Sequence, residues 1–288
     1  MSTASRLRKL LSGDELIVAP GVFDGISAAL VGTLGFAAAY MTGAGVCASA
    51  QGLPDIGLLT LTEMAERASV LAGLLEIPLI ADADTGYGSP INVVRTVREY
   101  ERAGVAAIQL EDQVFPKRCG HLAGKDVIGV DQFGLALQAA VEARRDPDTV
   151  IIARTDARAP LGIEEAISRA NRYASLGADV IFVEAPQSLE EIEQIAAEVD
   201  APLLLNVVPG GRTPEIAHAR LVELGYRIAI HPGVALAAVV PAAVEALSRL
   251  REQAPSRDGA VGPGGEAASA AGQPFPHLVR VPAALTHV

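Results

Sequence analysis

The chain has 288 residues, half of them hydrophobic, with 4% aromatic residues and no tryptophan. We therefore expect a core of Ala, Val, Leu and Ile, which suits parallel strands that are buried on both faces. The formal net charge of -11 argues against a nucleic-acid partner and against an anionic membrane surface, because both require a basic face on the protein.

The two cysteines, Cys47 and Cys119, are too few for a disulfide framework, and a reducing intracellular compartment is the simplest context for them. The basic residues near the amino terminus are followed by Ser12-Gly13-Asp14-Glu15, which interrupts any secretory signal. The most apolar segment, residues 234–240, is too short to span a bilayer. We expect a soluble cytoplasmic protein with no membrane partner.

A short helix is predicted near residues 4–11, and short aliphatic runs then alternate with amphipathic stretches along the chain. The runs predict eight strands, at residues 16–19, 37–41, 78–83, 106–110, 150–153, 180–183, 203–207 and 227–230. Each strand is followed by a stretch with the spacing of a helix.

Cap signals mark the ends of these helices. Thr60-x-x-Glu63 and Ser188-x-x-Glu191 read as capping boxes. Ser89-Pro90 and Thr213-Pro214 read as an N-cap followed by proline in the first turn. Glycines predict the carboxyl ends of four helices, at Gly35, Gly104, Gly177 and Gly225.

Eight strand-helix units with short connections predict an α/β protein with the (β/α)8 TIM barrel architecture. An open doubly wound sheet is the main alternative, but the first strand lacks the G-x-G-x-x-G fingerprint that often follows it there. We assign residues 1–252 to the barrel domain. Residues 253–288, rich in Gly, Ala and Pro, are predicted to be a flexible linker and tail.

The active site of such a barrel lies at the carboxyl ends of its strands, so the residues just after each strand are the candidates. This set is strongly polar, and it contains Thr42-Gly43-Ala44-Gly45, Asp82, Asp84, Glu111, Asp112, Arg154, Asp156, Glu184, Asn206 and His231. Solvated loops would scatter their charges rather than place them next to the strands. We interpret the pattern as a functional site.

Four carboxylates, Asp55, Asp82, Asp84 and Glu111, are expected to converge on the barrel mouth. Their mutual repulsion needs a cation to offset it. Oxygen ligands without a His or Cys cluster indicate Mg2+, or Mn2+, that keeps several of its waters. The alternative is that Asp82 and Asp84 cap the next helix or pair with Arg95 and Arg98.

Two features could hold a carboxylate of a ligand. The guanidinium of Arg154 can donate two parallel hydrogen bonds to a carboxylate. The backbone amides of the glycine-rich run 43–45 can also donate hydrogen bonds to a carboxylate. Alternatively, Arg154 and Asp156 form a structural ion pair.

The loop at residues 117–121 reads Lys-Arg-Cys-Gly-His. Positive neighbours favour ionisation of the Cys119 thiol, which makes it a candidate proton carrier. The alternative is that Cys119 is a small buried filler in a solvated loop. Cys47 is interpreted as structural.

Several motifs together resemble one family. They are residues 41–45 (MTGAG), 52–55 (GLPD), 82–88 (DADTGYG), 110–113 (LEDQ), 116–121 (PKRCGH), 153–156 (ARTD) and 184–185 (EA). They occur in the right order over about residues 10 to 250, and they resemble the isocitrate lyase and phosphoenolpyruvate mutase superfamily. The resemblance is strongest to the branch with 2-methylisocitrate lyase, 2,3-dimethylmalate lyase and carboxyphosphonoenolpyruvate phosphonomutase.

The resemblance implies roles for residues of this chain. Mg2+ would be carried chiefly by Asp84, with Asp55, Asp82 and Glu111 acting through water. Cys119 would be the general acid, with Lys117, His121 and Arg154 as further catalytic residues. The substrate would be a small anionic hydroxy or oxo carboxylate, contacted by Thr42, Gly43, Ala44, Asp82, Gly120, His121, Arg154, Glu184, Asn206 and His231.

The implied reaction is cleavage of the C2–C3 bond of a 2-hydroxy di- or tricarboxylate to an α-keto acid and a second carboxylate. The base that takes the hydroxyl proton stays open between Tyr40, Arg154 and a metal-bound water. Phosphonomutase chemistry, oxaloacetate or acylpyruvate hydrolysis or decarboxylation, and a barrel that only binds a metabolite are the alternatives.

The chain departs from the family pattern at two places that border the substrate pocket. Asn206 is followed by Val-Val-Pro-Gly-Gly, where relatives commonly have an acidic residue at the position of Pro209. His231-Pro232 stands where relatives often have Tyr-Pro. The resemblance also implies a homo-oligomer, a tetramer, in which the last barrel helix is exchanged between subunits; the apolar stretch 234–247 supports this.

Overall fold

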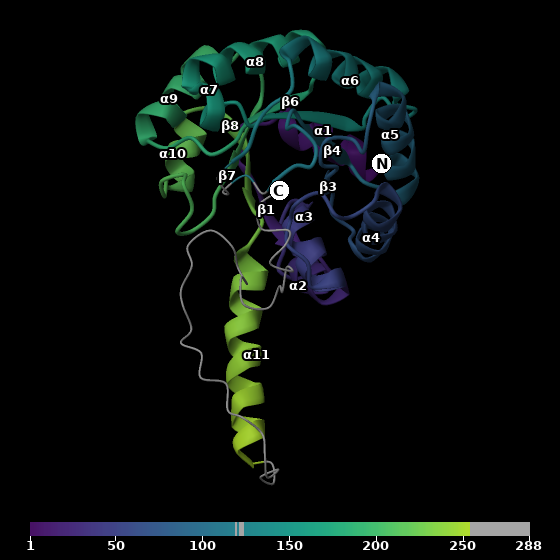
Figure 1. The fold of residues 1–288 in the computed structure, drawn as a ribbon, viewed down its shortest axis with the longest axis vertical. Helices are drawn as coiled ribbons and strands as arrows, with labels where there is room; N and C mark the ends of the chain where they lie inside the picture. The colour runs from purple at the N-terminus through teal and green to yellow at the C-terminus, as the bar shows by residue number, and fades with distance from the viewer. Residues whose placement is uncertain (119, 121–123, 254–288) are drawn as a thin grey trace.

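The structure, a computed structural model, describes residues 1–118, 120 and 124–253. Eight parallel strands close into a barrel in the order β1 to β8, with helices around it (Figure 1). The predicted (β/α)8 barrel is therefore confirmed. The predicted tail lies outside the described residues except for Gln253, which ends the last helix.

The strands are β1 (Ile17–Val22), β2 (Ala39–Met41), β3 (Leu79–Asp82), β4 (Ala107–Glu111), β5 (Val150–Thr155), β6 (Val180–Val183), β7 (Leu203–Asn206) and β8 (Tyr226–His231). The helices are α1 (Thr3–Leu11), α2 (Gly25–Thr33), α3 (Gly43–Val46), the π-helix η1 (Cys47–Gln51), α4 (Leu61–Leu74), α5 (Pro90–Ala103), α6 (Val130–Ala143), α7 (Arg158–Leu161), α8 (Ile163–Ser175), α9 (Leu189–Glu198), α10 (His218–Glu223) and α11 (Val234–Gln253). All eight predicted strands are present, with ends that differ by at most three residues, and β6 has both of its predicted ends.

Local cap chemistry begins and ends the helices much as the sequence predicts. Thr60 and Glu63 form both halves of a capping box on α4. Ser89 and Asn92 do the same on α5, with Pro90 in its first turn. The four predicted terminal glycines all have positive φ, at 79° for Gly35, 86° for Gly104, 99° for Gly177 and 82° for Gly225. Only glycine adopts this conformation without steric cost.

Of the remaining cap predictions, the capping box at Ser188 is confirmed in one of its two hydrogen bonds, and the cap at Thr213 is wrong. The Ser188 hydroxyl accepts from the Glu191 amide, but the Glu191 carboxylate binds Arg158 and the Gln187 amide instead of closing the box. Thr213 does not begin a helix, because its side chain is buried and α10 begins only at His218. The Thr213 hydroxyl oxygen is buried without a hydrogen-bond partner among the described residues, so it caps no helix.

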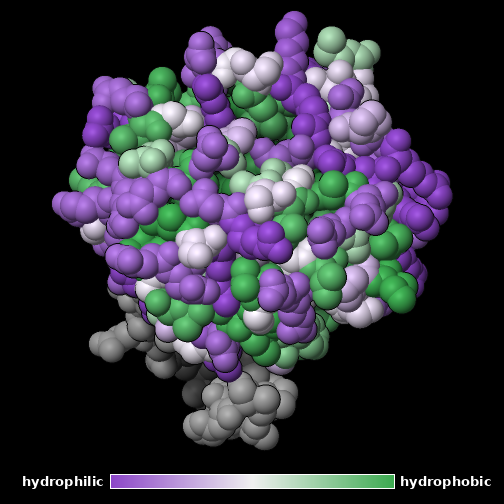
Figure 2. Space-filling model, turned by 90° about the horizontal axis from the view of Figure 1, so that it is seen from above, coloured by the Kyte–Doolittle hydropathy of each residue, from purple (hydrophilic) through white to green (hydrophobic). Residues whose placement is uncertain are grey.

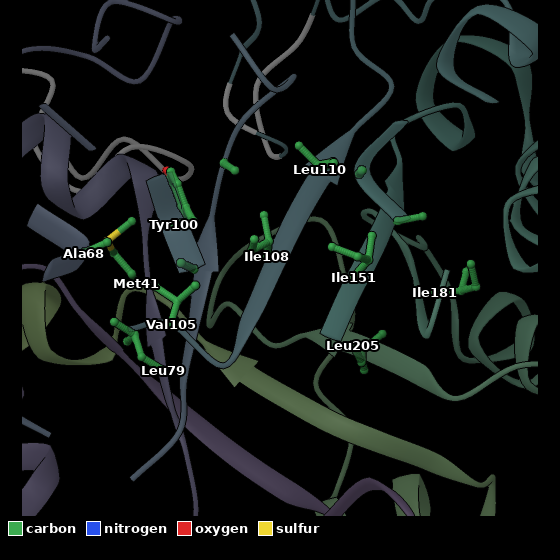
Figure 3. Packing of buried hydrophobic residues seen from close by; sticks show 14 of the residues in the cluster. Met41, Ala68, Leu79, Tyr100, Val105, Ile108, Leu110, Ile151, Ile181 and Leu205 are labelled. Atoms are coloured by element: carbon green, nitrogen blue, oxygen red, sulfur yellow. The ribbon is translucent and has the colours of Figure 1, made fainter. Parts of the chain in front are cut away.

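The core consists of two layers separated by the barrel wall. Residues on the outward faces of the strands, such as Met41, Ile108 and Ile151, pack against the helices (Figure 3). Residues on the inward faces, such as Ile80 and Ile152, fill the barrel interior. The interior layer also contains the buried Leu7, so α1 closes the end of the barrel at which the strands begin.

Gly21 in β1 leaves no room for a side chain. An added Cβ would overlap the backbone carbonyl of Pro232 and lie 2.7 Å from its Cα. Gly21→Ala is expected to lower the free energy of unfolding by about 3 kcal/mol, because a closed barrel cannot move this backbone freely. Urea unfolding followed by circular dichroism measures the loss.

Gly73 provides a matched control for this substitution. It is exposed in the last turn of α4, and an added Cβ there would meet nothing within 4 Å. Gly73→Ala is expected to raise the free energy of unfolding by about 0.5–1 kcal/mol, since alanine favours the helix. Equal unfolding midpoints for Gly21→Ala and the unmodified chain would contradict this view of β1.

The outer surface on the side seen in Figure 2 mixes hydrophilic and hydrophobic residues, without one large apolar area. None of the helices among the described residues has the length and apolarity needed to cross a membrane. The predicted cytoplasmic location stays a prediction from the sequence.

Candidate active site

The alternation of side chains along each strand carries polar groups to the interior of the barrel mouth. In β3, Ile80 fills the interior, and Asp82 follows two residues later on the same face. In β5, Ile152 is followed by Arg154 in the same way. The same period places Gln109 and Glu111 in β4, Glu184 after β6 and Asn206 in β7 on the interior face.

The β3 end supplies two of the predicted carboxylates. Asp82 accepts hydrogen bonds from the Gly43 amide at 3.3 Å and from the Asp84 amide at 3.1 Å. Asp84 has a φ of +48°, a left-handed conformation that costs a non-glycine residue energy. Such strain is retained where a side chain must point in one direction, and here it directs a buried carboxylate to the mouth.

Lys117 joins two of the acids. Its ammonium lies 2.5 Å from an Asp55 carboxylate oxygen and 2.7 Å from an Asp84 oxygen. Burial lowers the pKa of Lys117, but the carboxylates of Asp55 and Asp84 outweigh it and raise that pKa well above its usual range. Lys117 therefore stays charged. The alternative pairing of Asp84 with Arg95 or Arg98 is wrong.

Glu111 at the end of β4 lies beside Arg154 in β5, because the two residues are direct partners in the pairing of these strands. The Arg154 Nη1 atom is 3.1 Å from Glu111 Oε2, without the angles of a hydrogen bond. Both Glu111 carboxylate oxygens are thus buried without a hydrogen-bond donor from the described part of the chain. Burial raises the pKa of Glu111 well above its usual value.

Arg154 is also held from its other side. Its Nε and Nη2 atoms donate to the two carboxylate oxygens of Asp156 at 2.9 and 3.0 Å, and its guanidinium lies 5.3 Å from the centre of the Phe182 ring. The structural Arg154–Asp156 pair therefore exists, and it leaves Nη1 facing the mouth. Burial raises the pKa of Asp156, but Arg154 and Lys125 outweigh it and lower that pKa to about 2.

Asp112, also among the strand-end acids, has a structural role. It is fully buried and accepts from the Thr155 hydroxyl at 2.8 Å, the Tyr173 hydroxyl at 2.9 Å, Arg169 at 3.1 Å and the Asp156 amide at 2.9 Å. All of its hydrogen bonds go to the protein. Asp112 therefore ties the ends of β4 and β5 to α8.

Gly120 and Glu184 meet on the far side of Arg154. A Cβ on Gly120 would overlap the Glu184 carboxylate, and the Arg154 Nη2 atom lies 3.9 Å from Glu184 Oε1. The Asn206 amide donates to Glu184 at 3.5 Å. Three predicted substrate contacts, Gly120, Glu184 and Asn206, are thus brought together next to Arg154.

Three further predicted substrate contacts are Thr42, Ala44 and His231. Thr42 caps α3, its hydroxyl accepting from the Gly45 amide. Ala44 is half-buried in the same short helix. His231 at the end of β8 lies 3.0 Å from the His218 ring nitrogen on α10. Two predicted catalytic residues, Cys119 and His121, lie outside the described residues, and their roles stay predictions.

Sequence reasoning missed Gln109 as a member of the site. It is fully buried in β4, accepts from the Tyr40 hydroxyl at 3.2 Å and donates to Asp82 at 3.5 Å. The period of two along the strand, which puts Gln109 on the face of Glu111, was the available signal. Burial raises the pKa of Tyr40 well above its usual value, so its hydroxyl keeps its proton at neutral pH.

A cavity of about 830 Å³ lies beside the cluster, and none of the four predicted metal carboxylates lines it. It is bordered by the starts of α4, α5 and α6, with Tyr87 and Gln113 on its wall. Because the predicted metal carboxylates and Arg154 lie outside its lining, we define the candidate site by the buried charged cluster rather than by this cavity.

A closed parallel barrel with buried charged side chains at the carboxyl ends of its strands has the architecture of a (β/α)8-barrel enzyme. Residues 7–251 match the model of the phosphoenolpyruvate phosphomutase family, and the chain belongs to that family. The resemblance to the isocitrate lyase and phosphoenolpyruvate mutase superfamily is thereby confirmed, as is the prediction that the chain is an enzyme.

Within this superfamily the chain groups with lyases. It is 48% identical over 251 residues to 2,3-dimethylmalate lyase of Eubacterium barkeri, covering 87% of each chain. It is 46% identical over 252 residues to 2-methylisocitrate lyase of Aeropyrum pernix, covering 88% of this chain and 81% of that one. A solved oxaloacetate acetylhydrolase with the inhibitor 3,3-difluorooxalacetate is 45% identical, with a TM-score of 0.85 and 90% of each chain covered.

Proposed function

We propose that the protein is a Mg2+-dependent carbon-carbon lyase. Its substrate is a small 2-hydroxy di- or tricarboxylate of the 2-methylisocitrate or 2,3-dimethylmalate type, which it cleaves to an α-keto acid and a second carboxylate. The observation that carries the proposal is the buried cluster at the barrel mouth, where Arg154 and Lys117 face Asp84 and Glu111. The similarity to the two lyases supports the same substrate class.

The donor set fits a hard divalent cation. One Asp84 oxygen and both Glu111 oxygens are buried without a hydrogen bond from the described residues. Burial raises the pKa of Asp84 to about 6, because the cost of burying the carboxylate exceeds the compensation from the Lys117 ammonium 2.7 Å away. A divalent cation removes that cost and holds the acids ionised.

A cation that keeps much of its water needs few direct protein ligands. No three His, Cys, Asp or Glu side chains among the described residues are close enough to bind one ion together. Mg2+ commonly binds proteins through one or two carboxylates and several waters. We propose Asp84 as the direct ligand, with Asp55, Asp82 and Glu111 acting through water; Mn2+ suits the same oxygens.

The side chains divide the work of binding. The Nη1 edge of Arg154, which Asp156 leaves open, donates to a substrate carboxylate. Lys117 stays protonated and balances negative charge beside Asp84. Glu184 and Asn206 border the part of the substrate that leaves. When bound, Mg2+ stabilises the charge that develops on the oxo-acid oxygens as a Lewis acid.

The reaction removes the proton of the substrate 2-hydroxyl and adds a proton to the carbon that departs. A base takes the 2-hydroxyl proton, the C2–C3 bond breaks as the C2=O bond forms, and its electron pair goes to the departing carbon. Cys119 then gives its proton to that carbon. Tyr40 and Arg154 both hold their protons at neutral pH, since the pKa of each is raised well above its usual value. Neither side chain is therefore the base at neutral pH.

A second activity, hydrolysis of oxaloacetate, is favoured by one specific finding. The solved oxaloacetate acetylhydrolase and a solved 2,3-dimethylmalate lyase match this chain equally well, each at 45% identity with a TM-score of 0.85. Hydrolysis uses the same carboxylate and cation contacts, and it differs in adding water across the C–C bond.

One assay separates these activities. The protein with Mg2+ is incubated with 2-methylisocitrate, 2,3-dimethylmalate, oxaloacetate and phosphonopyruvate, and α-keto acid or oxalate release is followed. We expect α-keto acid from a 2-hydroxy acid, at least about 100-fold less with EDTA, and recovery on adding Mg2+. Turnover of phosphonopyruvate alone, or oxalate from oxaloacetate alone, would reject the lyase.

We also propose that the protein is a homo-oligomer that exchanges α11, with a tetramer as the expected form. The helix extends away from the barrel, and Leu236 is its only buried residue (Figure 1). Val239, Val244, Leu247 and Leu250 on it are exposed. An unpaired apolar helix of 20 residues is covered in solution by a second copy.

The oligomer is tested by light scattering after size-exclusion chromatography. We expect a mass that is a multiple of 29.7 kDa, and a lower mass for the double variant Val244→Glu/Leu247→Glu. A single-chain mass at micromolar concentration would reject the exchange.

A further inference from the structure

Lys125 has a buried ammonium that the proposed reaction leaves unassigned. Its side chain is 1% exposed, and Nζ donates to the Gly120 carbonyl oxygen and to Asp156 Oδ1, each at 2.6 Å. Lysine is almost never fully buried unless it is paired. One ammonium therefore fastens the backbone of the loop after β4 to a side chain just after β5.

The Asp156 carboxylate links Lys125 to Arg154. The carboxylate that receives Lys125 also receives Nε and Nη2 of Arg154 at 2.9 and 3.0 Å. Its backbone amide is held by Asp112, so the carboxylate has little freedom to turn. The position of the Arg154 guanidinium thus depends on the charge and direction of Asp156.

The Gly120 backbone closes the arrangement from the opposite side. An added Cβ at Gly120 would overlap the Glu184 carboxylate and lie 2.7 Å from Arg154 Nη2. The loop backbone therefore lies directly against the Arg154–Glu184 pair. Lys125, Asp156, Arg154 and Gly120 form a closed circuit of contacts, which we call the Lys125 bridge.

We propose that Lys125 is a positioning residue. Its contact with the Gly120 carbonyl oxygen and, through Asp156, with Arg154 fixes the position of the Arg154 guanidinium relative to the Gly120 backbone. The expected effect of Lys125 on turnover rests on the proposed function, in which Arg154 binds the substrate carboxylate. The expected effect of Lys125 on the position of the loop is independent of the proposed function. Displacing a binding group by about 1 Å costs an enzyme on the order of 100-fold in rate.

Removing Lys125 should leave the barrel folded. Asp156 keeps both hydrogen bonds from Arg154, so no buried charge loses all of its partners. Lys125→Met keeps the length and the apolar stem of the side chain. Lys9→Met is the matched control, because Lys9 is exposed on α1 at the opposite end of the barrel.

Two measurements are made on each variant. The first is kcat and KM for the substrate that the panel identifies. The second is the rate at which an arginine-specific protease cleaves after Arg118 in the native protein, which reports loop seating without activity. We expect Lys125→Met to lower kcat by about 100-fold and to raise the cleavage rate at least about tenfold. We expect Lys9→Met to change neither.

A double-mutant cycle tests the route through Asp156. If Lys125 acts through that carboxylate, Lys125→Met/Asp156→Asn loses no more kcat than Asp156→Asn alone. Additive losses would overturn the route. A merely structural Lys125 would lower the urea midpoint of Lys125→Met while kcat per folded molecule stays within twofold, and that result would overturn the proposal.

Lys125→Gln, which keeps a hydrogen-bond donor, is the second variant and serves the same test if Lys125→Met does not fold. If both variants are unfolded, Lys125 is a folding residue and the proposal fails. If the unmodified protein turns over no compound of the panel, the proposed function fails, while faster cleavage after Arg118 in folded Lys125→Met still supports the bridge.

Discussion

Cys119→Ser is expected to lower kcat by about 10²–10⁴-fold and to change KM by less than about threefold. A serine hydroxyl is a far weaker acid than a thiol, so it cannot give a proton to the departing carbon at a comparable rate. Substrate binding depends instead on the carboxylate contacts of Arg154, which the substitution leaves in place. Steady-state kinetics with Mg2+ present, on the substrate that the panel identifies, measures both constants.

Cys47 provides the matched control, since the chain has only these two cysteines. It lies in η1 and is 3% exposed, and burial raises the pKa of its thiol to about 12. Cys47→Ser places a hydroxyl in a buried position of the hydrophobic core cluster, so we expect a lower unfolding midpoint with kcat of the folded protein unchanged. Equal kcat for Cys119→Ser and the unmodified chain would remove Cys119 from the reaction.

Asp112→Asn is expected to lower the free energy of unfolding by about 3–5 kcal/mol. The substitution removes the negative charge opposite Arg169 and places an N–H group among four donors, from Thr155, Tyr173, Arg169 and Asp156. At least one buried donor then has no acceptor, and Arg169 loses a buried ionic partner. Thermal unfolding should show a midpoint roughly 10 °C lower.

Asp14→Asn is the control for this substitution. Asp14 has a fully exposed side chain 3.4 Å from Arg227, and exposed ion pairs of this kind contribute little to stability. We expect its unfolding midpoint to stay unchanged. If Asp112→Asn also left the midpoint unchanged, the described hydrogen bonds would not contribute measurably to joining β4, β5 and α8.

Much of the fold could be predicted because its signals are local. Short aliphatic runs marked the strands, and the capping box at Thr60 and the glycines at Gly104 and Gly177 marked the helix limits. Each signal depends on contacts within a few residues. Thr213-Pro214 failed because its cap signal competes with burial of the Thr213 side chain, which depends on distant residues.

The site was predictable only as a set of candidates. Parallel strands of a barrel end at one mouth, so polar residues after β3, β4 and β5 had to be neighbours. Their pairing did not follow from this. Lys117 could have been solvated, yet it contacts Asp55 and Asp84; His231 lies beside His218, a neighbour that the sequence did not reveal.

The sequence by itself determined the barrel, the superfamily and the acids at the strand ends, because periodicity, caps and ordered motifs are properties of neighbouring residues. Only the tertiary structure decided that Asp112 supports the fold while the carboxylate oxygens of Glu111, one residue earlier, have no hydrogen-bond donor among the described residues. It also decided that Lys125 joins Gly120 to Asp156. The physical reason is that partners of a buried charge come from segments distant in sequence, and closure of the barrel brings them within hydrogen-bond distance.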